Sequence, residues 1–278
     1  MCETIRLQRV LVCLDGSAYS ESAISSAIRR IKVTGGLLVG ISVVDIPGID
    51  NSVNNAGLNE LQKMDTLENA KNEAEGLLTN FANRCKEEGV QYECLKKIGT
   101  PNHEILEEAK FADLIFCGVK TFFHFDRDEG DIDTLEILLK QPACPVIAVP
   151  DFYEEAKNII IAYDGSYNST HTLKSYIYLS AKLSEECKFH LVNVTDEPAK
   201  GEQLLNMAEK YLNFHKVKVE KIILQGSPSE ELHDLAHSLK PSFLVLGASS
   251  KGFLASLFRG SVVKKILANP EIPTFFYV

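Results

Sequence analysis

The chain has 278 residues, of which 45% are hydrophobic and 24% are charged, and its formal net charge is −9. These proportions are typical of a folded protein of two ordinary domains and exclude an intrinsically disordered chain. The negative charge argues against nucleic acid as a main partner, because a phosphate backbone requires a basic surface. No apolar run approaches the length of a membrane span, so no membrane partner is expected.

Two further features favour a cytoplasmic protein. The N-terminal residues enter a strand-like run at once and lack the layout of a signal peptide. The seven cysteines are scattered, form no C-x-x-C pair, and are expected to be reduced, buried thiols.

The first half alternates apolar strand-like runs with segments of helical periodicity. Strands are predicted at residues 9–14, 37–45, 91–97, 113–117 and 145–149. Helices are predicted at residues 18–30, 61–86, 102–110 and 134–140. The Asn-rich segment 46–59 is predicted to be a loop, with a short helix as the alternative.

The second half repeats the same alternation. Strands are predicted at residues 158–163, 188–195, 218–224, 243–246 and 274–278. Helices are predicted at residues 170–183, 202–216, 230–239 and 262–268.

The two halves share short motifs in the same order, which indicates an internal repeat. Leu-Asp-Gly-Ser at 14–17 recurs as Tyr-Asp-Gly-Ser at 163–166, Gly-Thr-Pro at 99–101 as Gly-Ser-Pro at 226–228, Gly118 as Gly247, and Pro142-x-x-Pro145 as Pro270-x-x-Pro273. The first copy carries about 22 extra residues between its second strand and the Gly-Thr-Pro turn, where the Asn-rich segment lies. The sequence therefore predicts two tandem copies of one βαβαβαβαβ unit, residues 1–151 and 152–278.

Apolar strands that alternate with helices predict an α/β protein of two tandem, doubly wound, parallel five-stranded sheets. Ligands of such sheets bind beyond the carboxyl ends of the strands, where the strand order reverses. Asp15 and Asp164 end the first strands of the two copies, and Gly118 and Gly247 end the fourth strands. A ligand site is therefore expected beside these residues.

The segment after the fourth strand of the second copy has the composition of a phosphate-binding loop. Gly247-Ala-Ser-Ser250 is followed by nine residues and then by Gly260-Ser261, which opens a helical pattern. Backbone N–H groups at a helix N-terminus are donors for an anion. With this spacing and the Asp-Gly-Ser strand ends, nearly the whole chain resembles a tandem universal stress protein. Nucleotide-binding members of that family carry G-x2-G-x9-G-[S/T] here, and Ser250 stands in place of their second glycine.

The resemblance implies a Rossmann-like fold of the adenine nucleotide alpha hydrolase type and a regulatory role in the stress response. It also implies that the C-terminal copy binds ATP, and it leaves open whether Mg²⁺ binds together with the nucleotide. Asp164 would lie near the ribose or the metal-phosphate end, and Val194 would offer backbone groups to the adenine edge. The ribose and phosphates would contact a third group of residues: Gly247, Ser250, Gly260, Ser261 and the N–H of Val262. No general base or nucleophile is placed for catalysis, so no catalytic residue is predicted.

The first copy differs at the corresponding loop. Asp131-Ile132-Asp133 stands where Gly260-Ser261 should recur, and three more acids precede it, Asp126, Asp128 and Glu129. Because these charges repel phosphate, the first copy is predicted to have lost triphosphate binding. A solvated acidic loop is expected over 124–133, with a metal site as the alternative.

Other candidates remain open. His233 and His237 lie four residues apart on a predicted outer helix, which is half of a zinc site, but the sequence shows no clear third ligand and surface histidines are expected. Ser17 and Ser166 are expected to cap helices. The apolar last strands of the two copies are expected to pair within the chain as a pseudo-dimer, and a homodimer stays open. Two alternatives to a nucleotide-binding regulator are a nucleotide-free interaction scaffold and a slow ATPase.

Overall fold

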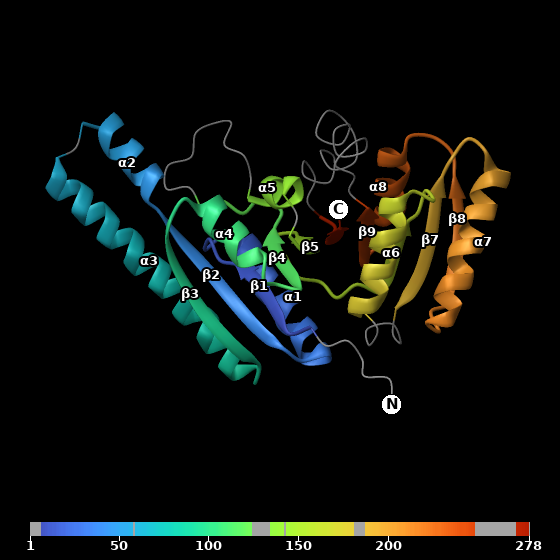
Figure 1. Ribbon diagram of the computed structural model, residues 1–278, viewed down its shortest axis with the longest axis horizontal. Coiled ribbons are helices and arrows are strands. Elements are labelled where there is room, and N and C mark those ends of the chain that lie inside the picture. Colours follow the sequence, from blue (N-terminus) through green and yellow to red (C-terminus); the bar gives the residue numbers. More distant parts are fainter. Residues whose placement is uncertain are drawn as a thin grey trace. The chain divides into compact units, whose positions relative to one another are not determined.

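Strands and helices alternate along the computed structural model, as an α/β fold requires (Figure 1). The structure describes residues 7–57, 59–123, 134–141, 143–180, 187–247 and 271–277. The chain divides into two compact units, one of Leu7–Cys144 and one that takes in the described part of Pro145–Val278.

The N-terminal unit is a parallel sheet with the strand order β3-β2-β1-β4. Its strands are β1 (Arg9–Cys13), β2 (Leu37–Asp45), β3 (Gln91–Gly99) and β4 (Leu114–Gly118). Its helices are α1 (Ala18–Thr34), α2 (Ile46–Asn55), α3 (Glu60–Glu87), α4 (Pro101–Ala109) and α5 (Thr134–Lys140). Every residue of β4 is buried, and β1 and β2 are each buried after their first residue, which explains their continuous apolar sequence.

The C-terminal unit repeats this arrangement with the strand order β5-β10-β9-β6-β7-β8. Its strands are β5 (Val146–Val149), β6 (Asn158–Ala162), β7 (Lys188–Val194), β8 (Val219–Leu224), β9 (Ser242–Gly247) and β10 (Thr274–Tyr277). Its helices within the described residues are α6 (Tyr167–Ser180), α7 (Pro198–Phe214) and α8 (Pro228–Ser238). The strand order reverses between β6 and β9, so a ligand is expected at the carboxyl ends of these two strands.

The last strands of the two repeats pair with each other, as predicted. β10 is antiparallel to β5, with Phe275 opposite Ile147, and parallel to β9. β5 therefore completes the sheet of the C-terminal unit although the repeat assigns it to the first copy. This pairing covers an apolar strand edge that would otherwise be open to association.

The Asn-rich segment is mostly a helix, so the prediction of a loop was wrong and its alternative was right. α2 packs on α3 through a small core that contains Val44, Ile49, Val53 and Ala74. Asn59 caps α3 in a capping box, because its side chain accepts the N–H of Gln62 and the Gln62 side chain accepts the N–H of Asn59, both at 3.0 Å.

Three helices of the C-terminal unit begin earlier than their periodicity predicts. α6 begins at Tyr167, α7 at Pro198 and α8 at Pro228, whereas the predicted starts were 170, 202 and 230. Proline suits the first turn, where its missing N–H would have no helical partner. The predicted helix over 262–268 lies outside the described residues.

Within the part of the chain that the structure describes, no helix is both long enough and apolar enough to span a membrane. The six described cysteines are free thiols, and four of them are buried as expected. Cys94 on β3 is exposed and Cys187 is half-buried, so the prediction of buried thiols was wrong for these two.

Candidate functional site

A tight turn at the end of β6 places Asp164. The N–H of Ser166 donates to Asp164 Oδ1 at 2.9 Å, and Gly165 between them has a φ of +78°, a conformation that glycine adopts without strain. Ser166 Oγ in turn accepts the N–H of Ser169 at 3.1 Å, which is the predicted N-cap of α6. The turn therefore fixes both the carboxylate and the first turn of the helix.

The Asp164 carboxylate is ionised at neutral pH. Burial raises the pKa of Asp164, but hydrogen bonds from Ser166 and Ser169 outweigh burial and leave this pKa below its ordinary value. Because the pKa is lower in the folded state, the ionised group stabilises the fold above the ordinary pKa of about 4. That contribution is lost as the pH falls through the folded pKa.

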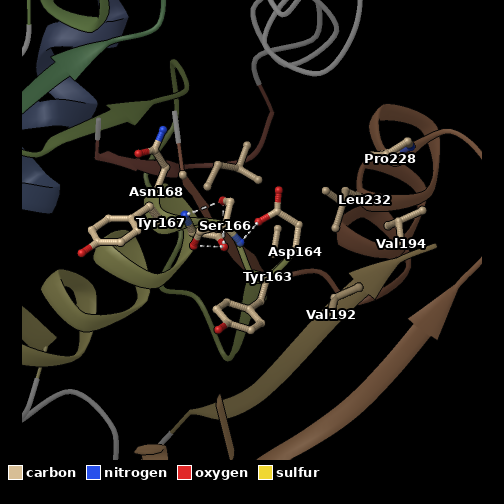
Figure 2. A pocket seen from close by; sticks show the side chains of 13 residues that line it. Tyr163, Asp164, Ser166, Tyr167, Asn168, Val192, Val194, Pro228 and Leu232 are labelled. Carbon is tan, nitrogen blue, oxygen red and sulfur yellow. Dashed lines mark hydrogen bonds between the residues drawn. The ribbon is translucent and has the colours of Figure 1, made fainter. Parts of the chain in front are cut away.

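A pocket of about 420 Å³ lies at the point where the strand order of the C-terminal unit reverses. Three residues predicted for the site line it: Asp164, Val194 and Gly247. Apolar side chains from β7, α8 and β9 form much of the rest, namely Val192, Leu232, Pro228 and Leu246. Figure 2 shows Asp164 at one side of this pocket and Val194, Leu232 and Pro228 at another. The pocket thus combines an apolar wall with a charged, polar end.

Gly247 is also required by packing. A Cβ at this position would lie 2.9 Å from the backbone N of Ser169 and 3.0 Å from the backbone C of Asn168. The first turn of α6 therefore approaches the end of β9 too closely for any side chain there. Gly247 keeps α6, and with it the Asp164 turn, against the sheet.

Val194 lies at the end of β7, beyond the last residue of β6. The N–H of Thr195 donates to Leu224 on β8, and the N–H of Tyr163 donates to Val192, both at 2.8 Å. Alternate residues of a strand in a parallel sheet bond to opposite neighbours. The N–H and C=O of Val194 therefore face the β6 side, where β6 has already ended at Ala162 and the pocket begins.

The remaining predicted site residues, Ser250, Gly260, Ser261 and Val262, lie outside the described residues, as does the acidic loop 124–133. The pocket also contains residues that the sequence did not predict as ligand contacts, among them Tyr163, Tyr167 and Asn168. Their position next to the repeated Asp-Gly-Ser motif is the one signal that could have identified them.

The corresponding place in the N-terminal unit is occupied by the chain itself. Asp15 Oδ1 accepts the N–H of Ser17 at 3.0 Å, like its counterpart, but Asp15 Oδ2 also accepts the N–H of Phe122 at 2.9 Å. Val119 and Thr121 in the same segment after β4 are fully buried. Both carboxylate oxygens of Asp15 are therefore used within the unit.

The two histidines of α8 lie side by side, with ring centroids 4.3 Å apart, and His237 Nδ1 lies 3.7 Å from Glu271 Oε2. Lys240 Nζ lies 2.5 Å from the same carboxylate oxygen. Among the described residues, no group of three or more histidine, cysteine or acidic side chains is arranged to hold a metal ion.

A family model described as the universal stress protein family matches residues 6–150 and 196–277. The chain belongs to the universal stress protein family. A universal stress protein of Methanocaldococcus jannaschii is 25% identical over 134 residues, which cover 42% of this chain and 79% of that protein. The matched segments leave out residues 151–195, so the position of Asp164 and Val194 in the site comes from the structure.

Solved structures share the fold over almost the whole chain. A universal stress protein from Archaeoglobus fulgidus has a TM-score of 0.74 at 17% identity and covers 98% of this chain, which covers 96% of it. A protein of unknown function from Pseudomonas aeruginosa has a TM-score of 0.59 at 13% identity, with 97% and 92% covered. The tandem, two-unit architecture is therefore found in other proteins of this fold.

Proposed function

We propose that this universal stress protein is a regulatory protein of the stress response that binds ATP in its C-terminal repeat, residues 152–278. The observation that carries the proposal is the pocket at the strand reversal, which brings ionised Asp164 and Val194 together beside Gly247. A carboxylate accepts hydrogen bonds from ribose hydroxyls or binds Mg²⁺ beside the phosphates. The apolar wall suits a purine base, and the Val194 backbone suits its edge.

We propose further that the N-terminal repeat, residues 1–151, does not bind nucleotide. Two observations support this. Asp15 uses both carboxylate oxygens within the unit, and the segment that donates the second of these bonds is buried around Thr121 and Phe123. The sequence adds acids in the following loop, at Asp131 and Asp133, and these repel phosphates.

The test is nucleotide analysis of the purified protein together with calorimetric titration, with and without Mg²⁺. Structures of other universal stress proteins have been solved with AMP and with cAMP bound. AMP and cAMP are therefore titrated alongside ATP as probes. We expect one ATP per chain and cytoplasmic recovery of the protein. Absence of bound nucleotide together with no measurable affinity for any probe would refute the proposal.

A variant in the second loop should remove this binding. Gly260→Asp places a negative charge where the motif offers donors to phosphate, so we expect no measurable ATP binding in titration. Gly130→Asp changes the same residue type in the loop of the first repeat and serves as the matched control, with unchanged stoichiometry and affinity. If both variants lost ATP binding equally, the effect would not be specific to the second loop. That result would contradict a single nucleotide site in the second repeat.

An interaction scaffold that needs no nucleotide is the second candidate. It is favoured by two large apolar side chains on α7, Met207 and Phe214, which are 68% and 86% exposed. Partners captured with the full chain would then be the same with and without ATP.

A slow ATPase would instead require turnover that Asp164→Asn removes. A homodimer remains a proposal, to be tested by light scattering.

A further inference from the structure

We infer that two copies of this chain associate through β3, by antiparallel pairing of β3 with its counterpart about a two-fold axis at Leu95. β3 is the outer strand of the N-terminal unit, because the strand order begins β3-β2 (Figure 1). Among the described residues, no strand pairs with its outer side. Association at this edge requires no nucleotide and is therefore independent of the proposed function.

β3 is long for the outer strand of a sheet. It spans nine residues, whereas β8, the outer strand of the second repeat, spans six. An unpaired edge offers a row of backbone N–H and C=O groups to another chain, and proteins commonly keep such edges short. The preceding helix is also longer, with 28 residues in α3 and 17 in α7. The extra residues of the first repeat therefore lengthen both the edge strand and the helix before it.

The two lysines of β3 do not protect this edge. Lysine on an edge strand commonly prevents pairing when its charge extends from the edge. Here Lys96 Nζ pairs with Glu75 of α3, and Lys97 Nζ lies 2.6 Å from Glu108 Oε1 of α4. Both charged groups are therefore held over the faces of the sheet by the unit's own helices.

The midpoint of β3 defines how two copies can pair. Directly opposite residues of antiparallel strands point to the same face of the sheet, so the two-fold axis must pass through a residue. Leu95 is the midpoint of Gln91–Gly99. An axis at Leu95 therefore pairs all nine residues of one copy with all nine of the other, and the interface is the same patch on both chains.

This register is complementary in charge and in apolar character. Glu93 faces Lys97 of the second copy on one side of the sheet, and the symmetry repeats this ion pair across the axis. On the other side Tyr92 faces Ile98, again twice, and Ile98 is 48% exposed in the single chain. Opposite charges and apolar side chains that face each other directly are the pairs that stabilise a sheet.

The neighbouring registers lose this complementarity. An axis at Lys96 would place two lysines directly opposite each other, which is destabilising. An axis at Cys94 would place Glu93 opposite Leu95 and leave its charge without a partner. The register that pairs the whole strand is thus also the one that matches the charges.

The outer strand of the second repeat cannot pair with itself in this way. β8 has six residues, so its midpoint falls between Lys221 and Ile222 and no two-fold axis can pair the whole strand. An axis at Lys221 would oppose two lysines, and an axis at Ile222 would place Glu220 opposite Leu224. Of the two outer strands, only β3 is therefore self-complementary.

Light scattering of a dilution series tests the association. Wild-type protein should reach twice the chain mass of 30.8 kDa. Glu93→Lys replaces two attractions with two repulsions, so we expect a dissociation constant about ten- to a hundredfold higher. Glu93 is exposed, so this variant should fold like wild type. Glu202→Lys makes the same exchange at an exposed position of α7 and should leave the dissociation constant unchanged.

Mixing two variants tests the register. Lys97→Glu alone should dimerise as poorly as Glu93→Lys, because it places two glutamates opposite two others. An equimolar mixture of the two variants should recover the dimer, because each lysine at 93 or 97 then faces a glutamate. A dimer formed at another surface would not respond to mixing. Dimerisation of both single variants like wild type would overturn the inference.

A crosslink tests the axis without any change of charge and decides the question if Lys97→Glu does not fold. Cys94→Ser removes the exposed thiol of β3, and Leu95→Cys in that background places a thiol on the axis. Bismaleimidoethane should then join two chains on a denaturing gel. Ile223→Cys on β8, in the same background, is the control and should stay unlinked. A wild-type protein that is monomeric at millimolar concentration, or a link at Ile223→Cys but not at Leu95→Cys, would overturn the inference.

Discussion

Asparagine in place of Asp15 should lower the free energy of unfolding by about 1–3 kcal/mol and leave ATP binding unchanged. The same exchange at Asp164 should change the stability by less than about 1 kcal/mol and weaken ATP binding about ten- to a hundredfold. The two residues occupy the same position in their repeats, and their different environments predict these opposite results.

The expected loss of stability in Asp15→Asn comes from the second carboxylate oxygen, which also accepts a hydrogen bond. Asp15 Oδ2 accepts the N–H of Phe122 at 2.9 Å, in addition to the bond from Ser17 at the other oxygen. In Asp15→Asn one of these acceptors becomes an NH₂ donor that faces a backbone N–H. A partly buried donor is then left without a partner, and the segment around the buried Thr121 loses its attachment to the turn after β1.

At Asp164 the turn needs only one acceptor. The amide oxygen of asparagine still accepts the Ser166 N–H, which now binds Asp164 Oδ1 at 2.9 Å, so the turn is kept. The change removes the negative charge that faces the pocket. A hydrogen bond to a charged group contributes about 1.5–3 kcal/mol, and this sets the expected loss of affinity.

Urea unfolding and calorimetric titration of the two variants check both expectations, and each variant is the control for the other. Loss of ATP binding in Asp15→Asn would contradict the proposal that the first repeat does not bind nucleotide. Unchanged ATP affinity in Asp164→Asn would remove Asp164 from the proposed site. In that case the Asp-Gly-Ser turn would be structural in both repeats.

This pair also shows how far the sequence could predict the site. The motifs Leu-Asp-Gly-Ser and Tyr-Asp-Gly-Ser gave the repeat and the place of both carboxylates, because strand ends and turns are encoded locally. Whether the second carboxylate oxygen is engaged depends on Phe122, more than 100 residues away, and no local pattern carries that information.

The fold was largely predictable for the same reason. Strand positions agreed within one or two residues, since buried parallel strands are continuous apolar runs. α2 was missed because three of its ten residues are Asn and its first turn holds Pro and Gly, so its helix depends on packing against α3 rather than on propensity.

Alanine at Gly247 is the second change with a large expected effect, a loss of about 1–3 kcal/mol in the free energy of unfolding, the usual effect of overpacking. The sequence assigned this glycine to the ligand, whereas the structure shows that its missing Cβ makes room for the backbone of Ser169, 2.9 Å away. Backbone atoms in the first turn of a helix have no rotamer by which to move aside. α6 must therefore shift away from the sheet and carry the Asp164 turn with it, so ATP binding should weaken as well.

The order of these two losses distinguishes the explanations. Gly76→Ala is the control, because a Cβ at Gly76 on α3 would meet nothing within 4 Å. It should stabilise the protein by about 0.5–1 kcal/mol through the helix preference of alanine. If Gly247→Ala destabilises the protein without any nucleotide present, the glycine is required by the contact between α6 and β9. If the variant unfolds like wild type and loses only ATP binding, close approach of the ligand is the reason for the glycine, and the packing explanation fails.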